Sequence, residues 1–344
     1  MDGADVEPAH PRRRPPGPTR SPAPASGPYP RPGPDIHLGD ESSMTPFQKK
    51  LQGSIPALLT ALTKDLTVDR ASMAKVARRV IDNGSKGVVV LGTTGEFAGI
   101  DDDQREAAIQ AVVEEVDAEA PVIVGCGQPN VRRTQEQARA AADLGADGIL
   151  VNPPFYFPMT QDETVSFFAD LVDVSPIPVM LYNIPSMTGV AVEPATIPRL
   201  RDVGVQGTKD SSGIPANTLA YLAALGPDSD FRVVVGGEPF FLHLLDAGVC
   251  ATTGLVPCVG PHFAARIYQA WHAGDYKAAF AAQHDANAFA TAVRGLHTFA
   301  PAAGKAVLSR LGLMEKWVAP PKMPLSDEEA DRAFETVKTF LPDG

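Results

Sequence analysis

The sequence predicts an α/β protein, a (β/α)8 TIM barrel with a small C-terminal helical region. Eight short runs rich in β-branched residues each precede a helical pattern, at a repeat of roughly 25 to 30 residues. The runs are nearly continuous in apolar residues, which is typical of parallel strands that helices cover. An open doubly wound sheet is the alternative, but the units carry no glycine fingerprint of a dinucleotide-binding turn.

Each unit follows the same pattern, starting with a strand after Gly53 and a helix capped by Thr67 or Asp69. Runs bounded by glycine, proline or polar residues predict strands at 54–60, 86–91, 121–125, 148–151, 178–182, 203–209, 232–235 and 250–255. Apolar residues three and four apart predict helices at 69–81, 101–116, 131–144, 161–174, 194–200, 215–225 and 239–246. We therefore expect a barrel over 50–260, then the last barrel helix plus C-terminal helices over 261–344.

Residues 1–44 differ in composition from the rest of the chain. Eleven of the 33 prolines fall between Pro8 and Pro34, among Arg, Gly and Ser residues. Such a segment cannot bury enough apolar surface to offset its chain entropy, so we expect disorder. The arginines at 12–14 are not followed by an apolar segment, so a secretory signal is not expected.

Charge and composition exclude several classes of function. A net charge of -11 argues against a nucleic-acid-binding protein, which usually presents a basic face. No apolar stretch approaches the ~18 residues that span a bilayer, so we expect no membrane association. Cys126, Cys250 and Cys258 lie in or beside apolar runs, which indicates buried thiols in a reducing cytoplasm. The histidines show no ligand spacing, so no metal site is expected.

The candidate catalytic residue is Lys209, in the segment Gly207–Gly213. An apolar run leads into this segment and places Lys209 at the carboxyl end of the sixth strand. Burial disfavours the ammonium form, so such an amine can be neutral near pH 7 and attack a carbonyl. The alternative is a lysine that pairs with Asp210 or extends to solvent. Lys86 precedes its strand, and Lys305 falls in the C-terminal helical part.

Catalytic residues of such barrels project from the carboxyl ends of the strands. The polar and glycine residues at these ends are Thr60, Thr63, Thr93, Thr94, Tyr182, Asn183, Gly236, Gly237, Thr252 and Thr253. The turn Gly92–Gly95 offers backbone N–H groups beside two hydroxyls, an arrangement suited to a carboxylate or phosphate, or is only a tight turn. Tyr182 is either a core tyrosine or, beside an imine-forming lysine, a phenol suited to shuttle protons.

Three segments resemble the dihydrodipicolinate synthase / N-acetylneuraminate lyase family: Gly92–Glu96, Tyr182–Gly189 and Gly207–Asp210. The resemblance covers residues 50 to 340 and leaves out the proline-rich segment. It implies a class I aldolase-type lyase that binds pyruvate, or a 2-oxo acid yielding it, as an imine on Lys209. No metal, flavin or nicotinamide cofactor is then required, because the imine itself is the electron sink.

The same resemblance implies roles for further residues. Tyr182 would relay protons, and Thr93, Thr94 and Gly95 would hold the carboxylate of the 2-oxo acid, with Thr94 also linking the proton relay. Tyr156 matches the tyrosine that family members lend to a neighbouring subunit's site. Its other interpretation is a surface or interface aromatic. Members of this family commonly form homotetramers, so the resemblance implies a homo-oligomer, which we expect in the cytoplasm.

The sequence also departs from the family pattern. Met187 stands where synthases that use aspartate semialdehyde carry an arginine, and a thioether cannot clamp an anion. Phe155 stands where those synthases have a second tyrosine, and Gly236–Glu238 replaces the Asp-Glu pair of sialic acid lyases. We therefore expect a lyase, aldolase or dehydratase for a 2-oxo-3-deoxy sugar acid, with Thr252, Met187 and Gly237 lining its site. The alternative is 4-hydroxy-tetrahydrodipicolinate synthase, which joins pyruvate and aspartate semialdehyde.

Two hypotheses come from other classes of function. A non-catalytic barrel that binds a small acid would need neither Lys209 nor Tyr182. A phosphate-handling barrel isomerase, indicated by the glycines near Gly236, would leave Lys209 without a role. In each case the expected ligand is a small molecule.

Overall fold

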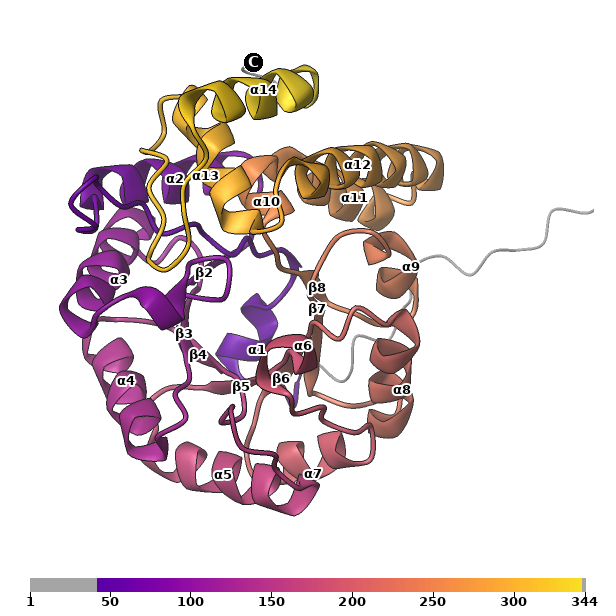
Figure 1. Cartoon of the computed structure of the whole chain (residues 1–344). Coiled ribbons are helices and arrows are strands. Elements are labelled where there is room, and N and C mark those ends of the chain that lie inside the picture. Colours follow the sequence, from indigo (N-terminus) through magenta and orange to yellow (C-terminus); the bar gives the residue numbers. More distant parts are fainter. Residues whose placement is uncertain (1–41, 342–344) are drawn as a thin grey trace, which may run out of the picture. The chain divides into compact units, whose positions relative to one another are not determined.

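Eight parallel strands form the centre of the structure, a computed structural model that describes residues 42–341 (Figure 1). The strands are β1 (Gly53–Ser54), β2 (Val88–Val90), β3 (Val122–Cys126), β4 (Gly148–Val151), β5 (Val179–Asn183), β6 (Gly207–Asp210), β7 (Arg232–Val235) and β8 (Ala251–Thr252). Their order is β1-β8-β7-β6-β5-β4-β3-β2, and a parallel bridge between Ala57 and Val89 joins the two ends. The predicted barrel is confirmed, and the open sheet is excluded.

A ring of helices packs around the strands (Figure 1). Its members are α2 (Arg70–Asp82), α3 (Asp102–Val116), α4 (Val131–Asp143), α5 (Gln161–Val174), α7 (Thr196–Asp202), α8 (Pro215–Leu225), α9 (Phe241–Asp246) and α11 (Pro261–His272). Asp69 is the N-cap of α2, and its side chain accepts from the Ser72 N–H. Of the two caps that the sequence offered, Asp69 is therefore the one used. The short helices α6 (Pro185–Thr188) and α10 (Val256–Val259) follow β5 and β8.

Some elements differ from their predicted bounds. The first strand is interrupted at Pro56, because proline has no N–H for the ladder, and pairing resumes at Ala57. The sixth strand begins at Gly207 rather than near Val203. Helix α7 runs to Asp202, and Gly204 then turns the chain with a φ of 98°, a conformation that glycine adopts at no steric cost.

A short helix that was not predicted from the sequence, α1 (Pro46–Lys50), closes the amino-terminal end of the barrel. Thr45 and Gln48 form a capping box, and proline occupies the first turn. Phe47 and Leu51 pack into the same buried cluster as Ile55, inside the strands. The disorder expected for residues 1–44 lies outside the described residues except at its last three positions, where Met44 is buried.

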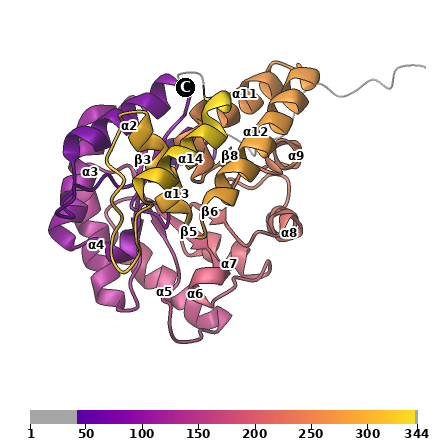
Figure 2. The same cartoon turned by 45° about the horizontal axis from the view of Figure 1, so that its top comes forward.

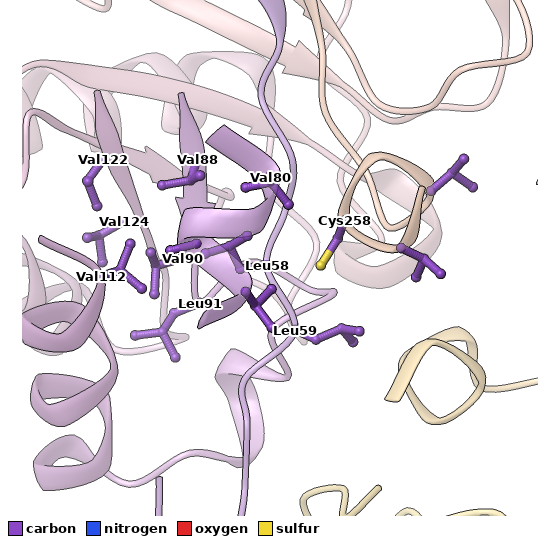
Figure 3. Packing of buried hydrophobic residues seen from close by; sticks show 14 of the residues in the cluster. Leu58, Leu59, Val80, Val88, Val90, Leu91, Val112, Val122, Val124 and Cys258 are labelled. Carbon is purple, nitrogen blue, oxygen red and sulfur yellow. The ribbon is translucent and has the colours of Figure 1, made fainter. Parts of the chain in front are cut away.

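Two apolar clusters hold the barrel together. Figure 3 shows the larger one where Val88 and Val90 of β2 and Val122 and Val124 of β3 meet the surrounding helices. Glycine lets these strands approach the neighbouring backbone, because a Cβ on Gly125 would lie 2.0 Å from the Leu91 carbonyl oxygen. The strands are thereby fixed in register, which determines which side chains reach the carboxyl rim.

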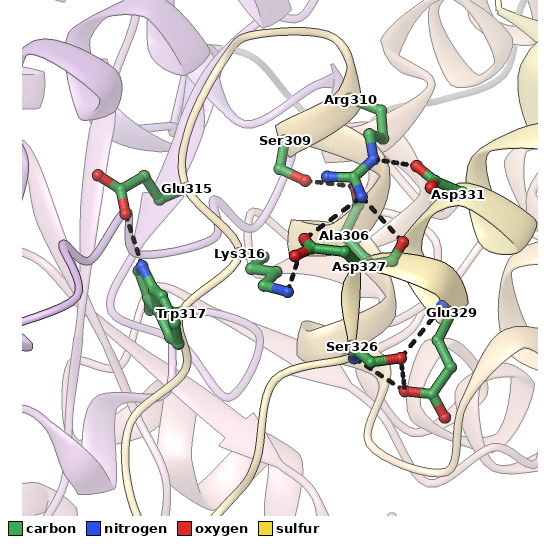
Figure 4. A network of polar contacts seen from close by, with 10 residues as sticks. All are labelled: Ala306, Ser309, Arg310, Glu315, Lys316, Trp317, Ser326, Asp327, Glu329 and Asp331. Carbon is green, nitrogen blue, oxygen red and sulfur yellow. Dashed lines mark hydrogen bonds and ion pairs between the residues drawn. The ribbon is translucent and has the colours of Figure 1, made fainter.

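The chain after α11 is helical, as predicted. It forms α12 (Tyr276–Leu296), α13 (Ala300–Arg310) and α14 (Asp327–Val337), which Figure 2 shows from a second side. Arg310 joins α13 to α14 by donating to Asp331 and Asp327, and Ser326 forms a capping box with Glu329 (Figure 4). The segment between α13 and α14 returns to the turn after β2, where the Ala319 N–H donates to Glu96 Oε2 at 2.7 Å.

Candidate active site

Lys209 and Tyr182 are direct neighbours on adjacent strands. The parallel register of β5 and β6 pairs Tyr182 with Lys209, so both side chains point to the same side of the sheet. Lys209 is 4% exposed and Tyr182 is 5% exposed. The Lys209 Nζ lies 4.3 Å from the centre of the phenol ring. The amine is thus buried against an aromatic ring. Burial is the environment that was predicted for Lys209 from the sequence.

Asp210 does not pair with Lys209, because successive residues of a strand point to opposite faces. Its carboxylate accepts hydrogen bonds on the other side of the sheet, from Asn183 Nδ2 at 2.9 Å and Thr218 Oγ1 at 2.7 Å. The Ser212 N–H donates to it as well, at 3.0 Å. Asp210 therefore links β6 to β5 and to α8 through hydrogen bonds. Its carboxylate points away from the Lys209 amine, which lies in the barrel interior.

The hydroxyl next to the Tyr182 phenol belongs to Thr93. The two oxygens lie 3.3 Å apart, which links the turn after β2 with β5 across the mouth of the barrel. The structure thus places Thr93, and not Thr94, in hydrogen-bond contact with Tyr182. In a tight turn consecutive side chains point in different directions, so a shift of one residue changes the partner.

The turn that carries Thr93 has little freedom. It begins after Leu91, which has a φ of 58°, and its Gly95 is buried so closely that a Cβ would lie 3.0 Å from the Leu58 carbonyl oxygen. Thr60 donates its hydroxyl proton to the Gly95 carbonyl at 2.6 Å. Gly95 is therefore required by the packing of the turn, and the turn presents Thr93 and Thr94, both partly exposed, at the rim.

At the end of β8 two consecutive threonines point in different directions. Thr252 is fully buried, and its hydroxyl donates to the Gly237 carbonyl at 3.1 Å, so it belongs to the wall rather than to the predicted substrate surface. Thr253 lines a small cavity together with Lys209, and no donor or acceptor of the described residues satisfies its hydroxyl. Of the two threonines, it is therefore Thr253, and not Thr252, that shares a cavity with Lys209.

The remaining predicted residues lie at the rim. Gly237 has a φ of 130°, which strongly favours glycine there, and its carbonyl is the acceptor for Thr252. Met187 lies on α6 and is 66% exposed. Tyr156 is 83% exposed and has a positive φ of 87°, and its ring meets Phe157 edge to face. None of these three contacts Lys209 through a hydrogen bond or ion pair within the part of the chain that the structure describes.

Comparisons with known proteins identify the family of the chain. The profile of the "Dihydrodipicolinate synthetase family" matches residues 50–340. The chain belongs to the dihydrodipicolinate synthetase family. It is 30% identical to the 4-hydroxy-tetrahydrodipicolinate synthase of Methanopyrus kandleri, over 82% of this chain and 93% of the relative. It is also 30% identical to a probable 2-dehydro-3-deoxy-D-pentonate aldolase of Escherichia coli, over 86% of this chain and 99% of the relative.

Solved structures of the family share the fold. One is a prophage protein of the dihydrodipicolinic acid synthase family from E. coli K12 in complex with pyruvate. It superposes with a TM-score of 0.80 at 26% identity, covering 84% of this chain and 98% of the other. Enzymes of this family form a Schiff base between pyruvate and a lysine and need no external cofactor. The chain is therefore an enzyme, a lyase of the class I aldolase type.

Three buried ionisable residues near the site, Lys305, Glu96 and Glu238, were not among the predicted site residues. Lys305 of α13 is fully buried, and its Nζ lies 2.5 Å from Glu96 Oε1, in the turn that also carries Thr93. Burial lowers the pKa of Lys305, and the Glu96 carboxylate opposes that shift. Glu238, just after β7, is 1% exposed, and burial raises its pKa. Glu238 could have been noticed in the sequence, because it is a charged residue inside an apolar run. The pairing of Glu96 with Lys305 could not, because the two residues lie 209 positions apart in the chain.

The described residues contain no group of three or more His, Cys, Asp or Glu side chains that could hold a metal ion. Among the described helices, none is both long and apolar enough to cross a membrane. The three cysteines are buried and free of disulfides, and burial raises the pKa of the Cys126 and Cys258 thiols to about 11. These thiols are protonated near neutral pH and are poor nucleophiles.

Proposed function

We propose that Lys209 is the lysine that forms the imine, and that the enzyme cleaves or dehydrates a 2-oxo-3-deoxy sugar acid. The observation that carries the proposal is the burial of the amine against Tyr182, whose phenol contacts the Thr93 hydroxyl. A buried amine next to a proton-shuttling phenol is what imine chemistry needs. This arrangement leaves the non-catalytic barrel and the phosphate isomerase without an explanation for Lys209.

The geometry supports a simple sequence of bond changes. The neutral Lys209 amine adds to the C2 ketone of the substrate, and the resulting hydroxyl leaves as water with the proton of the Tyr182 phenol, which gives a protonated imine and a phenolate. In cleavage, the C3–C4 bond breaks as this phenolate, hydrogen-bonded to Thr93, takes back a proton from the C4 hydroxyl, and an aldehyde leaves. The bond's electron pair passes into the imine to give an enamine. Protonation of the enamine at C3 and hydrolysis of the resulting imine release pyruvate and restore the amine.

The rim of the site favours a sugar acid over aspartate semialdehyde. Met187 is exposed at the position where the semialdehyde-using synthases carry a guanidinium, so a second substrate with its own carboxylate would lose a bidentate partner there. The similarity to the probable 2-dehydro-3-deoxy-D-pentonate aldolase of Escherichia coli supports this class of substrate. The second candidate is 4-hydroxy-tetrahydrodipicolinate synthase, which is favoured by the similarity to the Methanopyrus kandleri enzyme.

Tyr156 is the residue that we propose to act in a neighbouring subunit. An aromatic side chain that is 83% exposed on a backbone with positive φ is costly in an isolated chain. Phe157 beside it is 73% exposed, so the two rings form an apolar projection suited to insertion into another surface. We therefore propose a homo-oligomer, a tetramer in which this projection completes a partner's site, acting on a small 2-oxo acid in the cytoplasm.

The proposed imine has a direct test. Incubation with pyruvate and borohydride should add to the protein the mass of pyruvate less one water and plus two hydrogens, on a peptide that contains Lys209. The same protein is then assayed with 2-oxo-3-deoxy sugar acids, with pyruvate plus aspartate semialdehyde, and with sialic acid. Pyruvate release from a sugar acid supports the leading proposal, and pyruvate consumption with the semialdehyde supports the second candidate. A protein that gains no mass is not an imine-forming enzyme.

Substitution of Tyr182 by phenylalanine tests the proton relay. We expect kcat to fall by about 10² to 10⁴, the usual contribution of a positioned acid or base. The ring that packs on Lys209 remains, so the fold and the pyruvate adduct should persist. Tyr268→Phe is the matched control, because its hydroxyl bonds Gln52 at the amino-terminal end of the barrel. Equal activity of the two variants would remove Tyr182 from the relay.

A further inference from the structure

The small cavity that Lys209 lines is bordered by a second polar side chain, that of Thr253. The cavity lies inside the barrel and has a volume of about 10 Å³, the space of roughly one water molecule. Among the described residues, all the others that line it are leucine, isoleucine, valine or methionine. The mechanism above gives Thr253 no role, although its hydroxyl shares this apolar space with the amine.

Neither of these two polar side chains has a hydrogen-bond partner. Thr253 is 2% exposed, and its Oγ1 is bonded to no group of the described residues. The Lys209 nitrogen forms no hydrogen bond or ion pair in the same part of the chain, and its close contact is the Tyr182 ring, at 4.3 Å. A buried polar group without a partner is costly. The two groups are complementary, because a hydroxyl oxygen accepts the hydrogen bond that an amine N–H donates.

The position of Thr253 in the sheet explains why its side chain reaches this cavity. In the parallel register Lys209 pairs with Val234, and Val234 pairs with Ala251. Side chains alternate along a strand, so Thr253, two residues after Ala251, shares the inner face of the barrel with Lys209. The Thr253 N–H donates to the Val235 carbonyl at 2.9 Å. The hydroxyl is therefore held by backbone that is bonded into the sheet.

We propose that Thr253 is a positioning residue whose hydroxyl accepts a hydrogen bond from the Lys209 nitrogen and orients that nitrogen for attack on the 2-oxo acid. This inference rests on the proposed imine. A neutral amine has two N–H groups and one lone pair, so a bond from one N–H to Thr253 leaves the lone pair for C2 of the ketone. After water is lost, the N–H of the protonated imine has the same acceptor. Orientation of this kind matters because a misplacement of 1 Å can cost about 100-fold in rate.

Thr253→Val separates positioning from packing, because valine has the branched shape of threonine without the hydroxyl. The rate of imine formation with pyruvate, measured by adding borohydride at successive times, should fall about tenfold, in line with the loss of one hydrogen bond. The urea midpoint of unfolding should rise, because a methyl group replaces an unbonded hydroxyl in an apolar cavity. Thr253→Ser keeps the hydroxyl and loses a methyl group, so it should react close to the wild-type rate and have a lower midpoint. Rate and stability should thus rank the two variants in opposite orders.

Thr208→Val is the matched control. Thr208 of β6 is fully buried, and its hydroxyl also lacks a partner among the described residues, but alternation places it on the face opposite Lys209. Its variant should form the imine at the wild-type rate. A valine variant at 253 as fast as the wild type, or a serine variant no faster than the valine one, would overturn the inference alone. Thr253→Ala replaces the valine variant if that protein does not fold, since alanine and serine differ only by the hydroxyl. A wild type that forms no adduct would overturn the proposed function as well.

Discussion

Replacing Lys209 with methionine is expected to abolish the pyruvate adduct and to lower kcat by a factor on the order of 10⁶, the size of loss seen when a covalent nucleophile is removed. Methionine retains an unbranched apolar side chain of similar length, and it can pack on the Tyr182 ring in place of the aliphatic part of lysine. The fold should therefore survive, and the loss should be chemical. Intact mass after borohydride treatment and a turnover assay measure the two effects.

Lys86→Met is the matched control for this substitution. Lys86 is exposed and lies two residues before β2, so it is at the amino-terminal rim, opposite the site. Its variant should form the adduct as the wild type does. If Lys209→Met still gained the mass of reduced pyruvate, another lysine would carry the imine and the assignment of the site would be wrong.

Substitution of Lys305 by methionine is expected to lower the free energy of unfolding by about 3–5 kcal/mol, the cost of leaving a buried charge without its partner. The Lys305 ammonium lies between Glu96 Oε1, at 2.5 Å, and the Trp317 carbonyl, at 2.6 Å. Both side chains of the ion pair are at most 3% exposed. Methionine would fill the space of the lysine but leave the Glu96 carboxylate in an apolar surrounding. Urea denaturation at neutral pH, followed by circular dichroism, measures the change.

Two further variants separate the charge from the packing. The double variant Glu96→Gln/Lys305→Met removes both charges and should recover part of the lost stability, because no unpaired ion remains. Lys338→Met breaks an exposed pair with Glu335 and should cost less than about 1 kcal/mol. A loss for Lys305→Met no larger than for Lys338→Met would show that the buried pair contributes little to stability.

The sequence was sufficient to place the site because local patterns determine it. The alternation of strands and helices predicts a barrel, and the carboxyl ends of its strands must meet at one rim. Tyr182 and Lys209 each end a strand, and neighbouring parallel strands bring such residues together. The contact between Tyr182 and Lys209 could therefore be predicted from the sequence.

What the sequence did not reveal depends on register or on long-range contacts. Thr252 and Thr253 differ by one position, and a slip of one residue reverses the face to which a side chain points. The same kind of one-residue difference separates Thr93 from Thr94 in the turn after β2. Helix α1 is only five residues long, so its apolar spacing could not stand out, although the capping box at Thr45 was a readable sign. Glu96 and Lys305 come together through the fold alone.

The anchoring of Glu96 limits how this protein can be recombined with its relatives. The turn that presents Thr93 is tied to α13 by Lys305 and to the segment after it by the Ala319 N–H. An exchange of the C-terminal helices between two enzymes of the family would thus transfer Lys305 without Glu96 and separate the two residues of a buried ion pair. In a chimera whose crossover lies between residues 96 and 305, the residues at both positions must form an ion pair, or the turn after β2 will lose its contact with α13.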